Sequence, residues 1–256
     1  MPHGWQEEQP TPDTVTYCLF VEDTAAGRDL AKAVSARWPQ AEVRTEEREE
    51  EDWGRAWMEF FVPLECGQRF EILPPWLADK AKAGLTPVII EPKMAFGTGH
   101  HPTTALCLEG LAAILGNGHG WEGKHFLDLG TGSGILAIAA AKLGGKALGV
   151  DIDETVLPQA EENARRNGVG VRFLPGSLEE ALPHGPFDLL VANLFAELHR
   201  ELASRYRQAL APGGRLLLTG ILAEKASLVK EAMAREGFSL LEEEREGEWV
   251  LLAYGI

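Results

Sequence analysis

The chain has 256 residues, of which 45% are hydrophobic and 25% charged, a balance that is typical of globular proteins and excludes a fibrous or wholly disordered chain. No apolar run approaches the ~18–20 residues that span a bilayer, and the first residues lack the basic-then-apolar pattern of a signal peptide. Three widely spaced cysteines, Cys18, Cys66 and Cys107, exclude a disulfide framework and fit a reducing compartment. The sequence therefore predicts a cytoplasmic protein with no membrane association.

The charge is strongly acidic and unevenly distributed. The 24 basic and 39 acidic side chains give a net charge of −15, and residues 1–60 hold 14 acidic and 6 basic ones, which is −8 of that total. An acidic surface repels phosphate backbones, so we expect no direct nucleic-acid binding. It attracts a basic protein partner, although the acidic run at 46–52 can also be read as a solvated loop.

The first part of the chain has the pattern of a small α+β domain. Apolar spacing predicts a strand at 15–21, a helix at 23–38 and a short strand at 41–45. Pro74-Pro75 and the polar stretch at 79–84 have the composition of a turn and linker. We therefore expect a small domain over residues 1–65 and a flexible linker over 66–85.

From residue 86 onward, apolar strands alternate with helices. The predicted strands lie at 88–91, 125–129, 147–151, 171–174, 188–194 and 215–221, and the predicted helices at 102–115, 133–143, 154–167, 196–210 and 224–236. Two β-prone runs, 238–243 and 249–254, close the chain as an antiparallel pair. This pattern predicts a Rossmann-like, doubly wound α/β domain over 86–256, with a mostly parallel seven-stranded sheet.

A glycine-rich turn follows the predicted strand at 125–129. It reads D-L-G-T-G-S-G from Asp128, so that Gly130 and Gly132 permit positive φ angles and close approach of a ligand to the backbone. The dinucleotide fingerprint would need glycine where Ile135 stands, which disfavours a pyrophosphate. A neutral or zwitterionic ligand fits better, with Asp128 near its positive end, and a purely structural turn is the alternative.

Two further strand ends carry polar side chains. Asp151 lies 21 residues after Gly130, where a carboxylate reaches the ribose hydroxyls of a nucleoside, whereas Asp153 is placed to cap the next helix. Asn193 ends the strand at 188–194, and its carboxamide oxygen can accept a hydrogen bond from an attacking amine and so orient its lone pair. The alternative for Asn193 is a turn-capping role.

These strand ends resemble those of the class I S-adenosylmethionine-dependent methyltransferases. A second motif, E-P-K-M-A-F-G-T-G-H-H-P-T-T over residues 91–104, is similar to the signature of the bacterial PrmA family, which methylates the eleventh protein of the large ribosomal subunit. The resemblance covers about residues 50–256. It implies S-adenosylmethionine as cofactor, with contacts at Thr104, Gly130, Asp151 and Asn193, and a small N-terminal domain that docks the ribosomal protein.

The same resemblance implies methylation of lysine side-chain and N-terminal amines by a chain that we expect to be a monomer. From its own chemistry, Phe96 offers a ring that can shield a sulfonium and exclude water, and Pro102 is a favoured first helical residue. The pair His100-His101 lacks the partners of a metal motif, so we expect no metal.

Two alternatives remain open on the sequence. A methyltransferase of the same class could act on another protein or on a small molecule. A protein of a different kind could keep the nucleoside-binding residues without turnover. Methyl transfer to the eleventh large-subunit protein is the function that the combined motifs favour.

Overall fold

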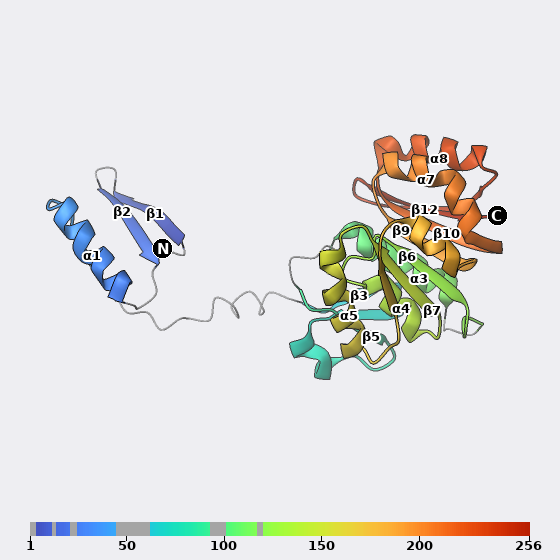
Figure 1. Cartoon of the computed structure of the whole chain (residues 1–256), viewed down its shortest axis with the longest axis horizontal. Helices are drawn as coiled ribbons and strands as arrows, with labels where there is room; N and C mark the ends of the chain where they lie inside the picture. Colours follow the sequence, from blue (N-terminus) through green and yellow to red (C-terminus); the bar gives the residue numbers. More distant parts are fainter. Residues whose placement is uncertain (1–3, 12–13, 21–24, 45–61, 93–100, 117–119) are drawn as a thin grey trace. The chain divides into compact units, whose positions relative to one another are not determined.

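The computed structural model describes residues 4–11, 14–20, 25–44, 62–92, 101–116 and 120–256. The chain divides into two compact units, Met1–Phe60 and Phe61–Ile256, which are described separately (Figure 1). Among the described helices, none combines the length and apolar character needed to cross a membrane.

The first unit contains a hairpin and one helix. Strand β1 (Gly4–Thr11) pairs antiparallel with β2 (Thr14–Phe20), and helix α1 spans Ala25–Arg37. The strand and helix predicted at 15–21 and 23–38 correspond to β2 and α1. The strand predicted at 41–45 is wrong over its described part, because residues 41–44 are exposed and form no strand. An alternating pattern without a surface to bury it does not hold a strand.

The boundary between the units lies earlier than the sequence predicts. Residues 66–85, expected as a linker, lie within the second unit, where β3 (Leu64–Cys66), β4 (Phe70–Leu73) and β5 (Thr86–Ile89) form a small sheet. The 3₁₀ helix η2 (Pro75–Lys80) carries the chain from β4 to its parallel neighbour β5. The prolines that suggested a linker therefore begin a short helix, a position that suits their fixed φ.

The second unit is built on the predicted seven-stranded sheet. Its strand order is β11-β12-β10-β9-β6-β7-β8, with β12 antiparallel to both of its neighbours and the other pairs parallel. The strands are β6 (His125–Leu129), β7 (Lys146–Asp151), β8 (Arg172–Pro175), β9 (Phe187–Asn193), β10 (Leu210–Leu222), β11 (Ser239–Glu246) and β12 (Trp249–Gly255). The predicted α/β fold is confirmed.

Helices cover both faces of this sheet. One face packs against α3 (Pro102–Leu115), α4 (Ile135–Lys142), α5 (Leu157–Arg166) and the small β3–β5 sheet. The other packs against α6 (Leu178–Ala181), α7 (Ala196–Ala209) and α8 (Ala226–Arg235). Short 3₁₀ turns, η3 (Glu154–Val156), η4 (Leu182–His184) and η5 (Ala223–Lys225), precede α5, follow α6 and precede α8.

The central strands are apolar on both faces because helices bury both. In β9, Leu189 and Val191 belong to one core and Leu190 and Ala192 to the other. A continuous apolar run is the pattern expected of such strands.

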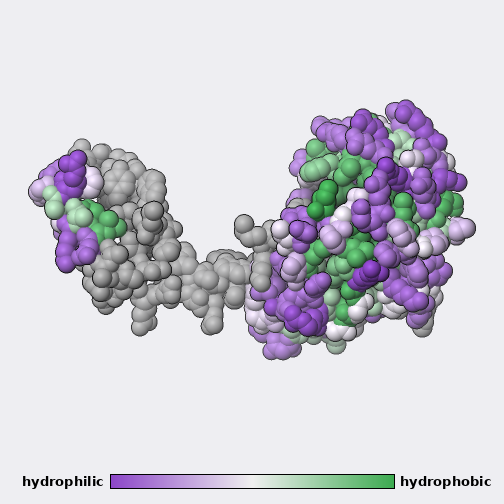
Figure 2. All heavy atoms as spheres, viewed as in Figure 1, coloured by the Kyte–Doolittle hydropathy of each residue, from purple (hydrophilic) through white to green (hydrophobic). Residues whose placement is uncertain are grey.

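Figure 2 shows hydrophilic side chains over much of the visible face of Phe61–Ile256, with apolar ones gathered toward its middle.

The order of the strands fixes where a ligand can enter. From β6 the chain proceeds outward through β7 and β8, then returns to the other side of β6 for β9 and β10. Connections therefore diverge between β6 and β9, and open α/β sheets bind ligands beyond the carboxyl ends of the strands at such a point. The ends of β6, β7 and β9 carry the glycine turn, Asp151 and Asn193.

Candidate active site

The turn between β6 and α4 is held tightly against the end of β7. Gly130, Gly132 and Gly134 have φ of 76°, 51° and 82°, the left-handed region that favours glycine. The backbone N–H groups of Gly130 and Thr131 donate to the Val150 carbonyl at 2.8 and 3.0 Å. The positive φ angles thus arise from a turn that folds back on the neighbouring strand.

Asp128 braces this turn from inside the protein. The residue is buried, and its Oδ2 accepts hydrogen bonds from the Thr131 hydroxyl at 2.8 Å and the Ala137 N–H at 3.2 Å. Burial raises the pKa of the Asp128 carboxyl to about 7, against the lowering effect of these two hydrogen bonds. The sequence predicts Asp128 near the positive end of a ligand; its observed contacts hold the turn.

The raised pKa of Asp128 predicts a pH-dependent stability. The unfolded carboxyl has a pKa of 3.8 and the folded one about 7, so the stabilisation from the protonated form is complete below pH 3.8 and is lost as the pH rises through about 7. We expect this group to lower the free energy of unfolding by about 2 kcal/mol between about pH 5 and about pH 7. Asp128→Asn keeps an oxygen acceptor but does not titrate.

Urea titrations of the wild type and of Asp128→Asn across this range measure the effect. The difference in unfolding free energy between them should move in favour of the variant as the pH rises. A difference that stays constant with pH would contradict the buried, titrating carboxyl.

Asp151 links the ends of β6 and β7. Its Oδ2 accepts from the Gly132 N–H at 2.9 Å and its Oδ1 from the Asp153 N–H at 3.0 Å. A carboxylate has about four acceptor positions, so both oxygens keep capacity for further donors. Asp153 instead caps η3, where its Oδ1 accepts from the Thr155 N–H at 3.0 Å, as its predicted capping role requires.

Asn193 is oriented by a chain of hydrogen bonds that begins on α3. Its Nδ2 donates to the Thr103 hydroxyl at 3.0 Å. The Thr103 N–H donates to His101 Nδ1 at 3.3 Å, so this ring nitrogen is an acceptor and carries no proton. The Thr103 hydroxyl, 2.7 Å from the same nitrogen, therefore also donates to it. The His101 ring also meets Trp249 edge to face at 5.2 Å. One Asn193 N–H is thus committed, and its Oδ1 is oriented as the acceptor.

Sequence reasoning did not identify this chain of contacts. Ninety residues separate Asn193 from Thr103, so no local pattern relates them. The available signal was His101 immediately before Pro102, because a polar side chain preceding a proline at the first helical position is where a helix cap is expected. His101 is that cap.

Thr104 carries a hydroxyl that lacks a partner. Its Oγ1 is fully buried and makes no hydrogen bond within the described part of the chain, although its neighbour Thr103 contacts Asn193. A buried hydroxyl without a partner costs about 1–3 kcal/mol. A ligand group at this end of the sheet would satisfy it, and the sequence resemblance places a cofactor contact at the same residue.

Replacing Thr104 by valine tests that reading. Because the shape is retained and an unpaired hydroxyl is removed, we expect the melting temperature to stay the same or rise. Affinity for S-adenosylmethionine should fall by about tenfold, the usual size of one lost hydrogen bond. Calorimetric titration measures this, and unchanged affinity would remove Thr104 from the site.

The end of β9 is supported from behind by α7. The buried His199 donates from Nε2 to the Thr219 carbonyl at 2.8 Å, which also accepts from the Leu194 N–H at 3.0 Å, and its Nδ1 accepts from the Tyr206 hydroxyl at 3.0 Å. Burial lowers the pKa of His199 to about 4, so the ring stays neutral. The backbone beside Asn193 is therefore fixed by a rigid, uncharged support.

Apolar residues follow the polar ones at the ends of β7 and β9. Leu194 lies over the glycine turn so closely that a Cβ on Gly130 would come within 2.9 Å of its Cδ2. Ile152 and Phe195, just beyond Asp151 and Asn193, are 85% and 77% exposed. Phe96 lies outside the described residues, so its predicted role stays a prediction.

The predicted site residues within the described part of the chain lie at the carboxyl ends of β6, β7 and β9 and on the first turn of α3. Hydrogen bonds join Gly132 to Asp151, and Asn193 to the first turn of α3. Contact of Leu194 with Gly130 connects the two groups. Such a grouping can hold a nucleoside-like ligand by its ribose and present an amide oxygen to a second reactant.

Comparison with known proteins identifies the family. Residues 4–255 match the family described as ribosomal protein L11 methyltransferase (PrmA). The ribosomal protein L11 methyltransferase of Thermus thermophilus is 63% identical over 210 residues, which cover 82% of this chain and 80% of that one. The Deinococcus radiodurans protein of the same name is 46% identical over 218 residues, covering 80% and 78%.

Solved structures agree with the sequence relatives. The ribosomal protein L11 methylase of Lactobacillus delbrueckii subsp. bulgaricus superposes with a TM-score of 0.68 at 31% identity, over 76% of this chain and 98% of that one. A 16S rRNA guanine methyltransferase of T. thermophilus, at 24% identity and a TM-score of 0.51 over 63% and 45%, shares the fold. The chain therefore belongs to the ribosomal protein L11 methyltransferase (PrmA) family.

Proposed function

We propose that this chain transfers methyl groups from S-adenosylmethionine to amines of ribosomal protein L11. The observation that carries the proposal is the family match over residues 4–255, together with relatives up to 63% identical that are named for this activity. Because the match includes both units, it supports the substrate as well as the chemistry.

The carboxyl ends of β6 and β7 and the first turn of α3 suit S-adenosylmethionine in three respects. Asp151 has free acceptor capacity for ribose hydroxyls, the buried Thr104 hydroxyl needs a partner, and Gly130 and Gly132, both half-buried, carry no Cβ that would keep a ligand from the end of β6. When bound, S-adenosylmethionine supplies a sulfonium methyl group already activated for transfer. We assign its contacts to Thr104, Gly130, Gly132, Asp151 and Asn193, with Asp128 behind the turn.

The acceptor nitrogen must be a neutral amine. A lysine amine has an unperturbed pKa near 10.4, and apolar surroundings such as Leu194 and Phe195 lower that pKa on burial. An N–H of the amine then donates a hydrogen bond to Asn193 Oδ1, which directs the nitrogen lone pair toward the methyl group. The new N–C bond forms as the S–C bond breaks, and water takes the proton from the resulting ammonium.

The acidic first unit is the proposed docking region for the substrate. Its net charge of −8 over residues 1–60 favours association with a basic protein over a phosphate backbone. We expect a cytoplasmic monomer that acts without direct nucleic-acid contact. Salt-dependent association rates with L11 would measure this attraction.

The acceptor chemistry is tested with chemically blocked substrate. L11 whose lysine and N-terminal amines have been acetylated should take up no labelled methyl from S-adenosylmethionine, whereas unblocked L11 should. Labelling of the blocked protein at an equal rate would refute amine methylation. Such labelling would still support S-adenosylmethionine as the methyl donor.

A further inference from the structure

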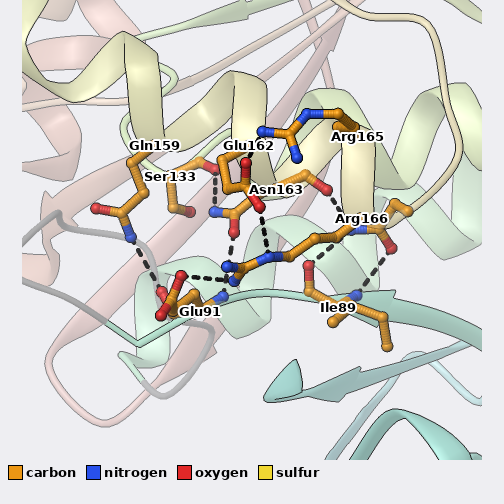
Figure 3. A network of polar contacts seen from close by, with 9 residues as sticks. Ile89, Glu91, Ser133, Gln159, Glu162, Asn163, Arg165 and Arg166 are labelled. Carbon is orange, nitrogen blue, oxygen red and sulfur yellow. Dashed lines mark hydrogen bonds and ion pairs between the residues drawn. The ribbon is translucent and has the colours of Figure 1, made fainter. Parts of the chain in front are cut away.

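Helix α5 presents a polar face to the end of strand β5. Figure 3 shows side chains of this helix contacting one residue, Glu91. Asn163 Oδ1 accepts from the Glu91 N–H at 3.2 Å, Gln159 Nε2 donates to the Glu91 carbonyl at 3.0 Å, and Arg166 forms an ion pair with the Glu91 carboxylate at 2.5 Å. One turn further along, Asn167 binds the N–H and carbonyl of Ile89 at 2.8 and 2.6 Å.

Asn163 differs from its neighbours because it also reaches the glycine turn. Its Nδ2 donates to the Ser133 carbonyl at 2.9 Å, and both residues are fully buried. The carboxamide therefore joins two backbone segments, at Glu91, two residues beyond β5, and at Ser133, between Gly132 and Gly134. A buried amide in such a position is satisfied only while both segments keep their places.

The turn is otherwise held from the sheet side. Asp151 binds the Gly132 N–H, and the Val150 carbonyl receives two more N–H groups. On the opposite side α5 packs closely, since a Cβ on Gly134 would lie 3.2 Å from the Ala160 Cβ. Asn163 adds a directional hydrogen bond to this contact, one that fixes the rotation of the Ser133 peptide.

We propose that Asn163 is a positioning residue for cofactor binding, which sets the conformation of the Gly130–Gly134 turn by linking Ser133 to Glu91, just beyond β5. This role rests on the proposed function, because the turn is taken as part of the S-adenosylmethionine site. Asn163 acts through Ser133 and needs no contact with the cofactor.

Asn167→Ala is the matched control for Asn163→Ala. Asn163 lies in α5 and Asn167 is the residue that caps its C-terminus. Both asparagine side chains bind backbone of β5 or of the residues just after it, but the described contacts of Asn167 do not include the glycine turn. A merely structural role predicts similar effects of the two substitutions. A positioning role predicts that they differ at the turn.

The test measures S-adenosylhomocysteine binding and turnover in both full-length variants. We expect similar losses of melting temperature, a Kd about tenfold weaker for Asn163→Ala and within about twofold of the wild type for Asn167→Ala. The KM for S-adenosylmethionine should rise in Asn163→Ala while kcat at saturation changes little. Equal shifts of Kd in the two variants would overturn the proposal.

Hydrogen exchange in the ligand-free protein gives a second, independent readout. Amides 132–135 should exchange faster in Asn163→Ala than in Asn167→Ala, and equal protection would overturn the proposal even if no cofactor binds. Failure of the wild type to bind S-adenosylhomocysteine would instead count against the proposed function. Asn163→Ser, which keeps a polar group at the site, replaces the alanine variant if that variant does not fold.

Discussion

Asn193→Ala is expected to lower kcat by about a hundredfold or more while weakening S-adenosylmethionine binding by no more than about threefold. Thr103 accepts a hydrogen bond from one Asn193 N–H. In the mechanism that we propose, Asn193 Oδ1 then orients the acceptor amine in the transfer step. Single-turnover rates and calorimetric affinities separate the two effects.

A matched variant tests how Asn193 is held. Thr103→Val removes the acceptor of its N–H but keeps the carboxamide, so kcat should fall by about tenfold, between the wild type and Asn193→Ala. Small and equal losses of turnover and affinity in Asn193→Ala would rule out the orienting role.

Asp151→Ala is expected to weaken cofactor binding by about 1–3 kcal/mol. Two losses combine in the variant. The proposed acceptors for the ribose hydroxyls are removed, and the Gly132 N–H loses the carboxylate oxygen to which it donates at 2.9 Å. Equilibrium titration with S-adenosylmethionine measures the loss.

Asp153→Ala is the control for this substitution. Asp153 lies two residues further along the same loop and caps η3 through the Thr155 N–H, so its loss should leave cofactor affinity unchanged. Unchanged affinity in Asp151→Ala, or an equal loss in both variants, would refute the assignment of Asp151 to the ribose.

The central strands of the seven-stranded sheet could be predicted because they are apolar on both faces and polar residues interrupt the pattern at their ends. Asp151 and Asn193 stand out for that reason, and the parallel arrangement brings the ends together. The glycine turn could be predicted because positive φ restricts the residues that fit.

Other features depend on contacts that no local pattern carries. Strand β1 contains the polar run G-W-Q-E-E-Q-P-T and is defined by its pairing with β2, so alternation could not reveal it. Asn163 looks like a surface residue in the polar sequence of α5, yet it is fully buried between segments 30 and 72 residues away. The Thr103 contact to Asn193 is of the same kind.

The linker that composition predicts over residues 66–85 lies within the second unit for a related reason. Pro74-Pro75 and the polar residues after it have linker composition, but strand pairing between β4 and β5 requires a connection at that point and makes it part of the second unit. Composition indicates only that a segment has no strong preference for a helix or a strand. Whether it connects two separate domains depends on whether the strands before and after it pair with each other, as β4 and β5 do here.

The central claim is that this chain methylates ribosomal protein L11 from S-adenosylmethionine. The most direct measurement incubates the full-length protein with S-adenosylmethionine and unmethylated large-subunit ribosomal proteins, and records intact masses over time. The account predicts a ladder of methyl additions confined to L11, which forms about a hundredfold or more slowly with Asn193→Ala. Cofactor binding without any addition to L11, or additions to other ribosomal proteins in its place, would contradict it.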